Sequence, residues 1–263
     1  MGRGVSNLGP FANPQSLIPN PSCYRSIVST PSKTTPSKIL VIDVGGTHVK
    51  VLATGMKLPI KIVSGASFTV TDMLREVKAA LKDRPYEAVS IGYPGPVVHS
   101  RPLREPFNLG AGWVGFNFRQ AFGRPVKIVN DAAMQALGSY EGGRMLFLGL
   151  GTGLGSAMIV DGVLQPMELA HLPYQSGKTY EDYLGLRGLQ RLGRKKWERK
   201  VIKVVTELRA ALAADYVVLG GGNVKKLKEL PDKTTLGSNN NAFLGGFRMW
   251  GVKQDSATRR RPK

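Results

Sequence analysis

Short apolar runs alternate with glycine-rich turns and more polar stretches along this chain. Runs rich in β-branched residues predict buried strands, and they span residues 39–42, 88–91, 127–129, 145–150, 157–160 and 216–219. Apolar residues three and four positions apart predict helices from about Thr71, through residues 132–137 and over residues 197–214. Strands interleaved with helices indicate an α/β architecture, and no internal repeat of fixed period is visible.

Composition divides the chain into four parts. Residues 1–37 contain no acidic residue, because Asp43 is the first carboxylate, and such a segment buries too little apolar area to fold. We expect residues 1–37 to be a disordered extension or a misassigned start, with an organelle-targeting segment as the alternative. Residues 38–130 and 131–250 are predicted as N-terminal and C-terminal α/β lobes, the last helix near 240–250 packing back on the first lobe, and 251–263 as a basic tail.

The charge balance is strongly basic. Thirty-seven Lys and Arg oppose eighteen Asp and Glu, a net charge of +19 that attracts polyanions such as nucleic acid, anionic lipid or polyphosphate. No stretch approaches the roughly 20 apolar residues of a membrane span, so we expect no membrane association. The single cysteine, Cys23, forms no internal disulfide, which fits a reducing compartment, and we expect a cytoplasmic protein unless the N-terminal extension targets an organelle.

The first of three glycine-rich turns follows the strand at 39–42. Asp43 stands at the strand end, Gly45, Gly46 and Thr47 form the turn, and Lys50 follows. Glycines let backbone amides approach a phosphate, the carboxylate suits a hydrated Mg²⁺, and the lysine adds a cation in reach of the same oxygens. An ordinary β-hairpin turn is the alternative, since Gly-Gly is a common hairpin signal.

Two further glycine turns also follow strands. Gly151, Thr152 and Gly153 lie in a stretch of alternating glycines suited to wrap a polyphosphate, and the strand expected after it differs from the helix of a dinucleotide fingerprint. Gly220, Gly221 and Gly222 let a nucleotide or phosphate chain lie close to the backbone. Each turn alone is explained as a loop, but three of them together indicate a phosphate site.

A carboxylate and a polar pair complete the candidate chemistry. Asp131 follows a strand and Asn130, at the edge where open α/β sheets bind ligands, and is our candidate general base; an N-cap of the following helix is the alternative. Glu168 and His171, three residues apart, present an acceptor and an imidazole to neighbouring hydroxyls of a small ring. A surface glutamate and a structural histidine are the alternative for that pair.

At this point the sequence resembles the ROK sugar kinases, and within them the polyphosphate glucokinase branch. The stretches that carry the resemblance occur in family order and are IDVGGTHVK at 42–50, GYPGPV at 92–97, NLGAGW at 108–113, VNDA at 129–132, LGLGTGLGSAMIVDGVL at 148–164, ELAH at 168–171 and VLGGG at 218–222. The resemblance implies an actin-like, ribonuclease-H-like, two-lobed phosphotransferase fold with a central cleft.

The resemblance also implies roles for single residues. Asp131 would be the catalytic base, Asn108, Asn130, Glu168, His171 and Glu181 would contact the sugar, and Mg²⁺ would be held by Asp43 through water. Donor phosphates would be held by Asp43, Gly45, Gly46, Thr47, Lys50, Gly151, Thr152, Gly153, Gly220, Gly221 and Gly222. Ala170 departs from the family glycine at that position. We expect no structural zinc, because the family's cysteine cluster is absent, and we expect a homodimer.

The densest basic region bears on the phosphate donor. Its predicted polyphosphate track consists of Arg194, Lys195, Lys196, Arg199, Lys200 and Lys203; a solvated helix face is the alternative. A long polyanion gains from such a track whereas ATP does not need one, so polyphosphate, alone or alongside ATP, is favoured over ATP alone.

These observations predict a kinase that converts a hexose, with glucose favoured, into its 6-phosphate. An ATP-only hexose or amino-sugar kinase of the same fold is the first alternative. A non-catalytic sugar sensor and a polyanion-binding or nucleic-acid-binding protein are alternatives of another class. Intact Asp131 argues against the sensor, and the lack of clustered stacking aromatics argues against nucleic acid.

Overall fold

A computed structural model describes residues 35–238 and 240–251 of the chain. The extension predicted for residues 1–37 lies outside the described residues except for 35–37, and the predicted basic tail lies outside them except for Gly251.

The first sheet joins an antiparallel meander to two parallel strands. Its strand order is β3-β2-β1-β4-β7, and the strands are β1 (Ile39–Val44), β2 (His48–Ala53), β3 (Ile60–Val63), β4 (Ala88–Tyr93) and β7 (Val126–Asn130). β2 runs antiparallel to β1 and β3, whereas β4 runs parallel to β1 and β7. Every residue of β1 and β4 is buried, which explains why both strands are continuous apolar runs in the sequence.

The second sheet repeats this arrangement. Its order is β10-β9-β8-β13-β14, built from β8 (Arg144–Leu150), β9 (Leu154–Val160), β10 (Val163–Pro166), β13 (Tyr216–Gly220) and β14 (Thr234–Leu236). β8, β9 and β10 form the antiparallel meander, and β13 and β14 continue it in parallel. The chain therefore contains a structural repeat that has no fixed period in the sequence, because the segments inserted between equivalent strands differ in length.

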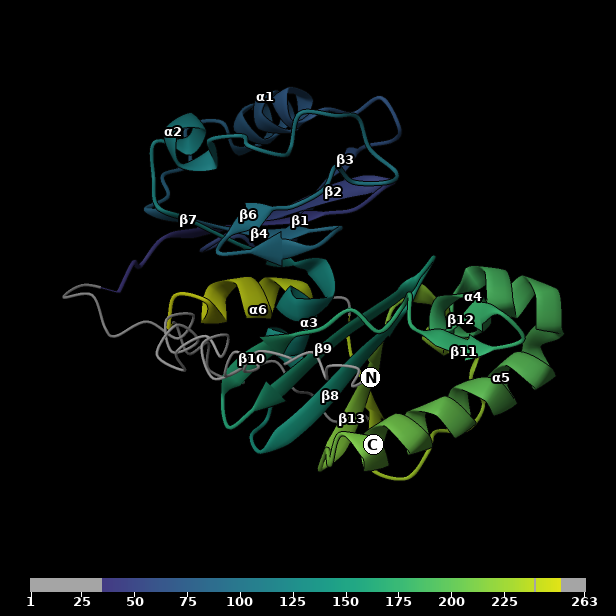
Figure 1. Cartoon of the computed structure of the whole chain (residues 1–263). Coiled ribbons are helices and arrows are strands. Elements are labelled where there is room, and N and C mark those ends of the chain that lie inside the picture. The colour runs from purple at the N-terminus through teal and green to yellow at the C-terminus, as the bar shows by residue number, and fades with distance from the viewer. Residues whose placement is uncertain (1–34, 239, 252–263) are drawn as a thin grey trace, which may run out of the picture.

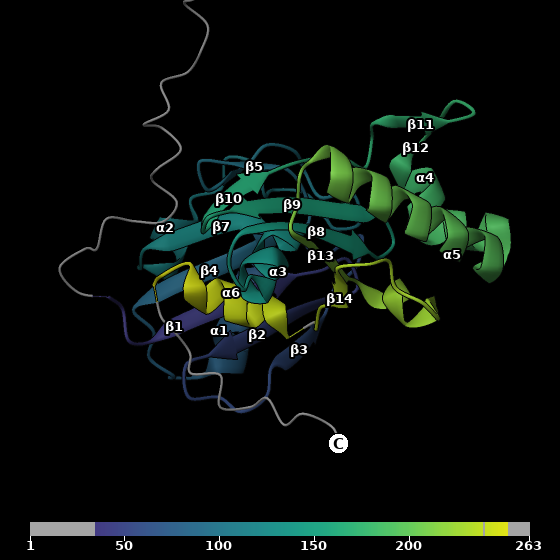
Figure 2. The same ribbon diagram turned by 90° about the horizontal axis from the view of Figure 1, so that it is seen from below.

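Helices cover both sheets and fill the space between them (Figure 1). α1 (Val70–Leu81) and α2 (Phe118–Phe122) lie on the outer face of the first sheet, α3 (Asp131–Ser139) and α6 (Asn241–Arg248) lie between the sheets, and α4 (Tyr180–Leu184) and α5 (Leu186–Ala211) flank the second sheet. Figure 2 shows α3 and α6 side by side from below. Two small hairpins, β5 (Val97–Val98) with β6 (Arg101–Pro102) and β11 (Pro173–Gln175) with β12 (Lys178–Thr179), and the 3₁₀ helix η3 (Gly222–Lys226) complete the described elements.

The two central helices cross at unusually close range. A Cβ atom on Gly138 of α3 would overlap the backbone of Asn241, and one on Gly245 of α6 would overlap the backbone of Met134. α6 is tied to the first sheet because the Ser90 hydroxyl donates a 2.6 Å hydrogen bond to the Gly246 carbonyl. Since α3 also packs on β9 of the second sheet, the residue at its start is fixed relative to both sheets.

The longest helix differs from the sequence prediction. α5 begins at Leu186 and ends at Ala211, whereas apolar periodicity predicted residues 197–214. Its first part carries Leu186, Leu189 and Leu192, but a backbone break at Gly193 (φ 70°, ψ 158°) separates it from the rest, so no single apolar period runs through both parts. The other predicted strands and helices are present with boundaries shifted by a few residues. Among the described residues, no helix combines the length and apolar character needed to cross a bilayer.

Candidate active site

The first glycine turn connects β1 and β2 and is a hairpin, as the alternative interpretation held. The Gly45 amide donates a 3.1 Å hydrogen bond to the His48 carbonyl. Asp43, at the end of β1, is only 8% exposed, and its carboxylate forms a 3.1 Å ion pair with Lys50 Nζ. A Cβ on Gly46 would lie 2.9 Å from the Cβ of Asn108, so the loop that carries Asn108 lies directly against this turn.

Asp131 is the first residue of α3, and a glycine from each sheet lies against the start of this helix. A Cβ on Gly155 of β9 would lie 2.7 Å from the Ala132 Cβ, whereas a Cβ on Gly92 of β4 would overlap the end of the Met134 side chain and make an ordinary 3.5 Å contact with the Asp131 Cα. The second sheet can therefore approach the beginning of α3 more closely than a side chain at residue 155 would permit.

Asn130, and not Asp131, is the N-cap of α3. Its side-chain oxygen accepts hydrogen bonds from the amides of Ala132 (2.9 Å) and Ala133 (3.3 Å), and its Nδ2 donates to the Gly95 carbonyl at 3.2 Å. The alternative interpretation of Asp131 as the cap is therefore wrong. One oxygen of Asp131 accepts from the Ala132 amide at 2.8 Å, and the cap leaves the Asp131 carboxylate available for another purpose.

Burial first, and then the negative charge of Asp43, raise the pKa of Asp131 to about 7. Glu168 adds a smaller effect in the same direction, while the Ala132 amide opposes it. Asp43 ends β1 of the first sheet and Glu168 follows β10 of the second sheet. Carboxylates from both sheets thus act on one side chain, and Asp131 changes its protonation state near neutral pH.

The second glycine turn joins β8 to β9 and is held from two sides. The Gly151 carbonyl accepts hydrogen bonds from Asn223 Nδ2 (2.7 Å) and from the Leu186 amide (3.1 Å). The Thr152 carbonyl also accepts from Leu186, at 3.2 Å. Because Asn223 belongs to η3 and Leu186 begins α5, three segments far apart in the sequence fix the shape of this turn.

The third glycine turn packs directly on the second. Gly221 has φ +86° and a Cβ there would overlap the Leu150 carbonyl, at the end of β8. Only glycine suits both the left-handed backbone and the contact. Two of the three predicted phosphate turns are therefore neighbours at the same end of the second sheet.

Glu181 lies against the second glycine turn. One carboxylate oxygen accepts a 3.3 Å hydrogen bond from the Leu154 amide, and the other forms a 3.1 Å ion pair with Arg187. A Cβ on Gly153 would overlap the Glu181 carboxylate. Glu181, predicted from the sequence as a sugar ligand, thus has both oxygens bound within the protein.

The segment with Glu168 and His171 is anchored by a buried serine. Ser156 Oγ donates to the Met167 carbonyl and accepts from the Leu169 amide, both at 3.1 Å. The Ala170 side chain is buried, and its carbonyl accepts a 3.0 Å hydrogen bond from the Glu181 amide. Glu168 and His171 are exposed. The methyl group of Ala170 therefore packs into the core under this segment.

The predicted polyphosphate track lies on α5. Lys196, Arg199, Lys200 and Lys203 line, together with Leu192, a shallow hollow of about 330 Å³. Arg194 and Lys195 are exposed beside it.

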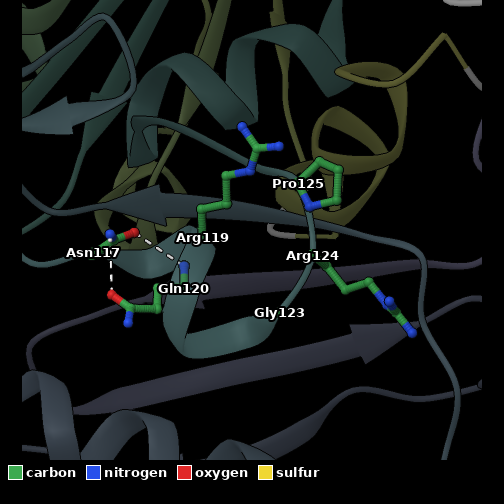
Figure 3. A pocket seen from close by; sticks show the side chains of 6 residues that line it. All are labelled: Asn117, Arg119, Gln120, Gly123, Arg124 and Pro125. Carbon is green, nitrogen blue, oxygen red and sulfur yellow. Dashed lines mark hydrogen bonds between the residues drawn. The ribbon is translucent and has the colours of Figure 1, made fainter.

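Another hollow, of about 460 Å³, lies beside α2 and contains none of the predicted site residues. Figure 3 shows its lining: Arg119 and Arg124 point in different directions, and the Asn117 side chain is bonded to Gln120. Arg124 Nε donates to the Tyr86 carbonyl at 3.0 Å. This hollow has no carboxylate in its lining, so it offers no general base.

Sequence reasoning missed four residues that shape the site. Gly92 and Gly155 admit the start of α3, Asn223 holds the second glycine turn, and Arg187 pairs with Glu181. Gly92 and Gly155 stood within the quoted motifs GYPGPV and LGLGTGLGSAMIVDGVL, and Asn223 directly follows the three glycines at 220–222. The roles of Gly155, Asn223 and Arg187 depend on partners distant in the sequence.

Comparison with known proteins shows which family this chain resembles. The model of the ROK family matches residues 39–166. The polyphosphate glucokinase of Mycobacterium tuberculosis (strain ATCC 25618 / H37Rv) is 30% identical over 223 residues, which cover 75% of this chain and 82% of that protein. The chain belongs to the ROK family. The resemblance inferred from the motifs is thereby confirmed.

Other ROK family relatives agree. The polyphosphate glucokinase of Mycobacterium leprae (strain TN) is 26% identical over 207 residues, covering 70% of this chain and 63% of the relative. The inorganic polyphosphate/ATP-glucomannokinase of Arthrobacter sp. strain KM has a similar structure, with a TM-score of 0.70, 22% identity and coverage of 84% of this chain and 100% of that one.

A ROK family glucokinase from Streptomyces griseus, solved with glucose and AMPPNP, superposes with a TM-score of 0.64 at 16% identity, covering 81% of this chain and 99% of that chain. At such identities the structural likeness bears on the fold alone. The predicted actin-like α/β fold is confirmed.

Proposed function

We propose that this ROK family chain is a sugar kinase that transfers a phosphoryl group from inorganic polyphosphate, ATP or both to glucose, forming glucose 6-phosphate. The observation that carries the proposal is the carboxylate of Asp131, which has a pKa of about 7 under the influence of Asp43 and Glu168. The polyphosphate glucokinases to which the chain is similar support the choice of acceptor and donor.

The proposed mechanism assigns proton removal to Asp131. A sugar hydroxyl is a weak nucleophile until a base takes its proton as it attacks the phosphorus, and a base with a pKa near the working pH does this best. α3 holds Asp131 between the two sheets, so its carboxylate is positioned before the substrate binds. Such positioning removes part of the entropy cost of bringing the reacting groups together.

Asn108, Asn130, Glu168 and His171 are the proposed sugar ligands. Asn130 keeps one donor hydrogen of Nδ2 after its bond to Gly95. Glu181 is a weaker candidate, because its carboxylate is held by the Leu154 amide and by Arg187. We propose that Glu181 instead keeps the second glycine turn in shape for the donor.

The donor phosphates are proposed to lie against the glycine turns, with Lys50 in reach of the same oxygens. Asp43 suits a hydrated Mg²⁺, because it is a buried carboxylate at a strand end beside glycines. In residues 35–238 and 240–251, no group of three or more His, Cys, Asp and Glu side chains forms a cage for a metal. The ion would therefore be held largely by the donor, with Asp43 contributing through water. When bound, Mg²⁺ neutralises charge on the phosphates.

Donor and acceptor are tested together by assaying product formation from glucose, mannose, fructose and their amino derivatives, each with ATP or with polyphosphate of defined length, in the presence of Mg²⁺. We expect glucose to be phosphorylated with polyphosphate. Turnover with ATP alone would support the ATP-only alternative, and no turnover on any pair would end the kinase assignment. The predicted homodimer is checked separately by light scattering of the eluting protein during size-exclusion chromatography.

A further inference from the structure

The basic face of α5 has a regular geometry. Lys196, Arg199, Lys200 and Lys203 are spaced by three and four residues, so they lie on one face of the helix. With Leu192 they line the hollow of about 330 Å³ described above. We call these four cations the α5 cluster.

The acid within this segment does not neutralise the cluster. The Glu198 carboxylate is engaged elsewhere, because its Oε1 accepts hydrogen bonds from the backbone amides of Lys228 and Glu229. Lys203 lies 3.7 Å from Glu207, but both side chains are more than half exposed, at 61% and 53%, and such pairs contribute little. Within the described chain no carboxylate pairs with Lys196 or Arg199.

One member of the cluster is held in place by neutral groups. Lys200 Nζ donates a 2.7 Å hydrogen bond to Gln175 Oε1 of β11 and lies 5.6 Å from the ring centroid of Tyr183. These contacts fix the ammonium group without cancelling its charge. The cluster therefore presents a partly ordered positive surface to solvent.

The same helix begins at the second glycine turn. The Leu186 amide binds the carbonyls of Gly151 and Thr152. The α5 cluster lies on the part of this helix that follows the backbone break at Gly193. The chain from Leu186 to Lys203 thus connects the second glycine turn with the cluster, and a phosphate chain that continues beyond the turn is the ligand able to use both.

Nucleic acid is a poorer match for the α5 cluster. Single-stranded nucleic acid is held by aromatic rings on which bases stack. Trp197, the tryptophan within the basic segment, is fully buried, and its Nε1 donates to the Leu184 carbonyl at 3.0 Å. A polyanion without bases needs cations alone.

We propose that the α5 cluster is a second subsite, outside the catalytic site, that binds the distal part of an inorganic polyphosphate chain whose terminal phosphate lies at the glycine turns. The inference rests on the proposed function and deepens it by naming where the donor extends. It implies that the length of the donor affects its binding but not the chemistry at Asp131.

The test removes three charges without deleting their side chains, in the variant K196Q/R199Q/K203Q. We expect KM for long-chain polyphosphate to rise about tenfold or more. The slope of log affinity against log salt should fall in magnitude by about 2. KM for glucose, and kcat/KM with tripolyphosphate or ATP, should stay within about twofold of the unsubstituted chain, because the catalytic site is unchanged.

The matched control is K57Q/K78Q/R84Q, which removes three exposed cations from the part of the chain that forms the first sheet and α1. An equal rise in KM for long polyphosphate in both variants would mean that net charge alone matters and would overturn the proposal. So would an unchanged KM in the α5 variant, or an equal loss with tripolyphosphate.

Direct binding separates this inference from the kinase assignment. Fluorescence anisotropy of end-labelled long polyphosphate is measured with Asp131→Asn protein, with and without the three α5 substitutions. We expect tight, salt-sensitive binding that the substitutions weaken, even if no donor supports turnover. Binding that is equal in both proteins, or that generic single-stranded DNA displaces more effectively than unlabelled polyphosphate, would contradict the α5 subsite.

Discussion

The two sheets share one strand order but carry different residues at equivalent positions. In the β1–β2 hairpin of the first sheet, the residue pair one step from the turn is Asp43 opposite Lys50, and the two side chains form an ion pair. In the β8–β9 hairpin of the second sheet, the equivalent residue pair is Gly149 opposite Gly155. The parallel neighbour is a glycine in both sheets, Gly92 beside Asp43 and Gly220 beside Gly149.

This difference gives Asp131, the proposed general base, two unlike neighbours. The first sheet supplies charge close to Asp131, because Asp43 raises its pKa. The second sheet supplies space, because Gly155 has no side chain to obstruct Ala132. Asp131 lies between the β1–β2 hairpin, which carries an ion pair, and the β8–β9 hairpin, which carries two glycines. Substitutions in the two hairpins should therefore affect the pKa and the position of Asp131 to different degrees.

The largest effect is expected from removing the proposed base. Asp131→Asn keeps the size of the side chain and cannot accept the sugar proton, so kcat should fall by roughly 10³-fold, within the range for a general base. Steady-state kinetics with glucose and polyphosphate measure this, and calorimetry should find glucose binding retained. Asp161→Asn, in the turn after β9, is the control and should be fully active; a loss of less than about tenfold for Asp131→Asn would exclude the role of base.

A smaller loss is expected from the charged hairpin. Asp43→Asn removes the carboxylate that the second sheet lacks and leaves Lys50 without its partner, so kcat/KM for the donor should fall about 100-fold. The pKa of Asp131 should fall as well, because a negative charge near it is lost. Asp83→Asn, an exposed position after α1, serves as the control. An Asp43→Asn variant with normal donor kinetics would show that the β1–β2 hairpin does not form part of the phosphate site.

The pH profile sharpens the same comparison. The base acts when deprotonated, so kcat/KM should rise with pH to a midpoint near 7 and fall about tenfold per unit below it. Because the folded pKa lies above that of an unfolded aspartate, Asp131 also makes folding less favourable as pH rises from about 4 to about 7.

Two variants test the origin of that profile. Glu168→Gln should move the kinetic midpoint to lower pH, since Glu168 raises the pKa of Asp131. Asp131→Asn should be more resistant to thermal unfolding than the unsubstituted chain above pH 7, because it no longer buries an ionised carboxylate. A kinetic midpoint that lies near the ordinary aspartate value would show that the surroundings of Asp131 are not what the geometry implies.

The smallest effect is expected from adding a side chain to the β8–β9 hairpin. Gly155→Ala places a methyl 2.7 Å from the Ala132 Cβ, so α3 must shift, and kcat should fall about tenfold with a loss of roughly 1–3 kcal/mol in stability. Gly92→Ala meets mainly the flexible end of Met134 and should cost less.

Gly65→Ala is the matched control for both glycine variants, because nothing lies within 4 Å of its Cβ position. Activity and thermal unfolding of the three variants are compared side by side. If Gly155→Ala behaved like Gly65→Ala, close approach of β9 would not position Asp131.

Local patterns in the sequence predicted most strands, the three glycine turns and Asp131. Apolar runs and glycines act through neighbouring residues, so they can be interpreted without the rest of the chain. The start of α5 was missed because it is short and because the backbone break at Gly193 interrupts the apolar period of the following part of the helix. The sequence did not reveal that the two sheets repeat one strand arrangement, because equivalent strands have the same order and pairing directions but different residues.

The sequence by itself determined which residues are chemically able to act: a carboxylate after a strand, glycines where backbone must come close, and a basic segment. Only the tertiary structure decided what they do to one another. Asp43, Asp131 and Glu168 are far apart along the chain, and the pKa of a carboxylate depends on the burial and charges around it in space. The same reason explains why Glu181 is held by Leu154 and Arg187, a pairing that no local pattern could reveal.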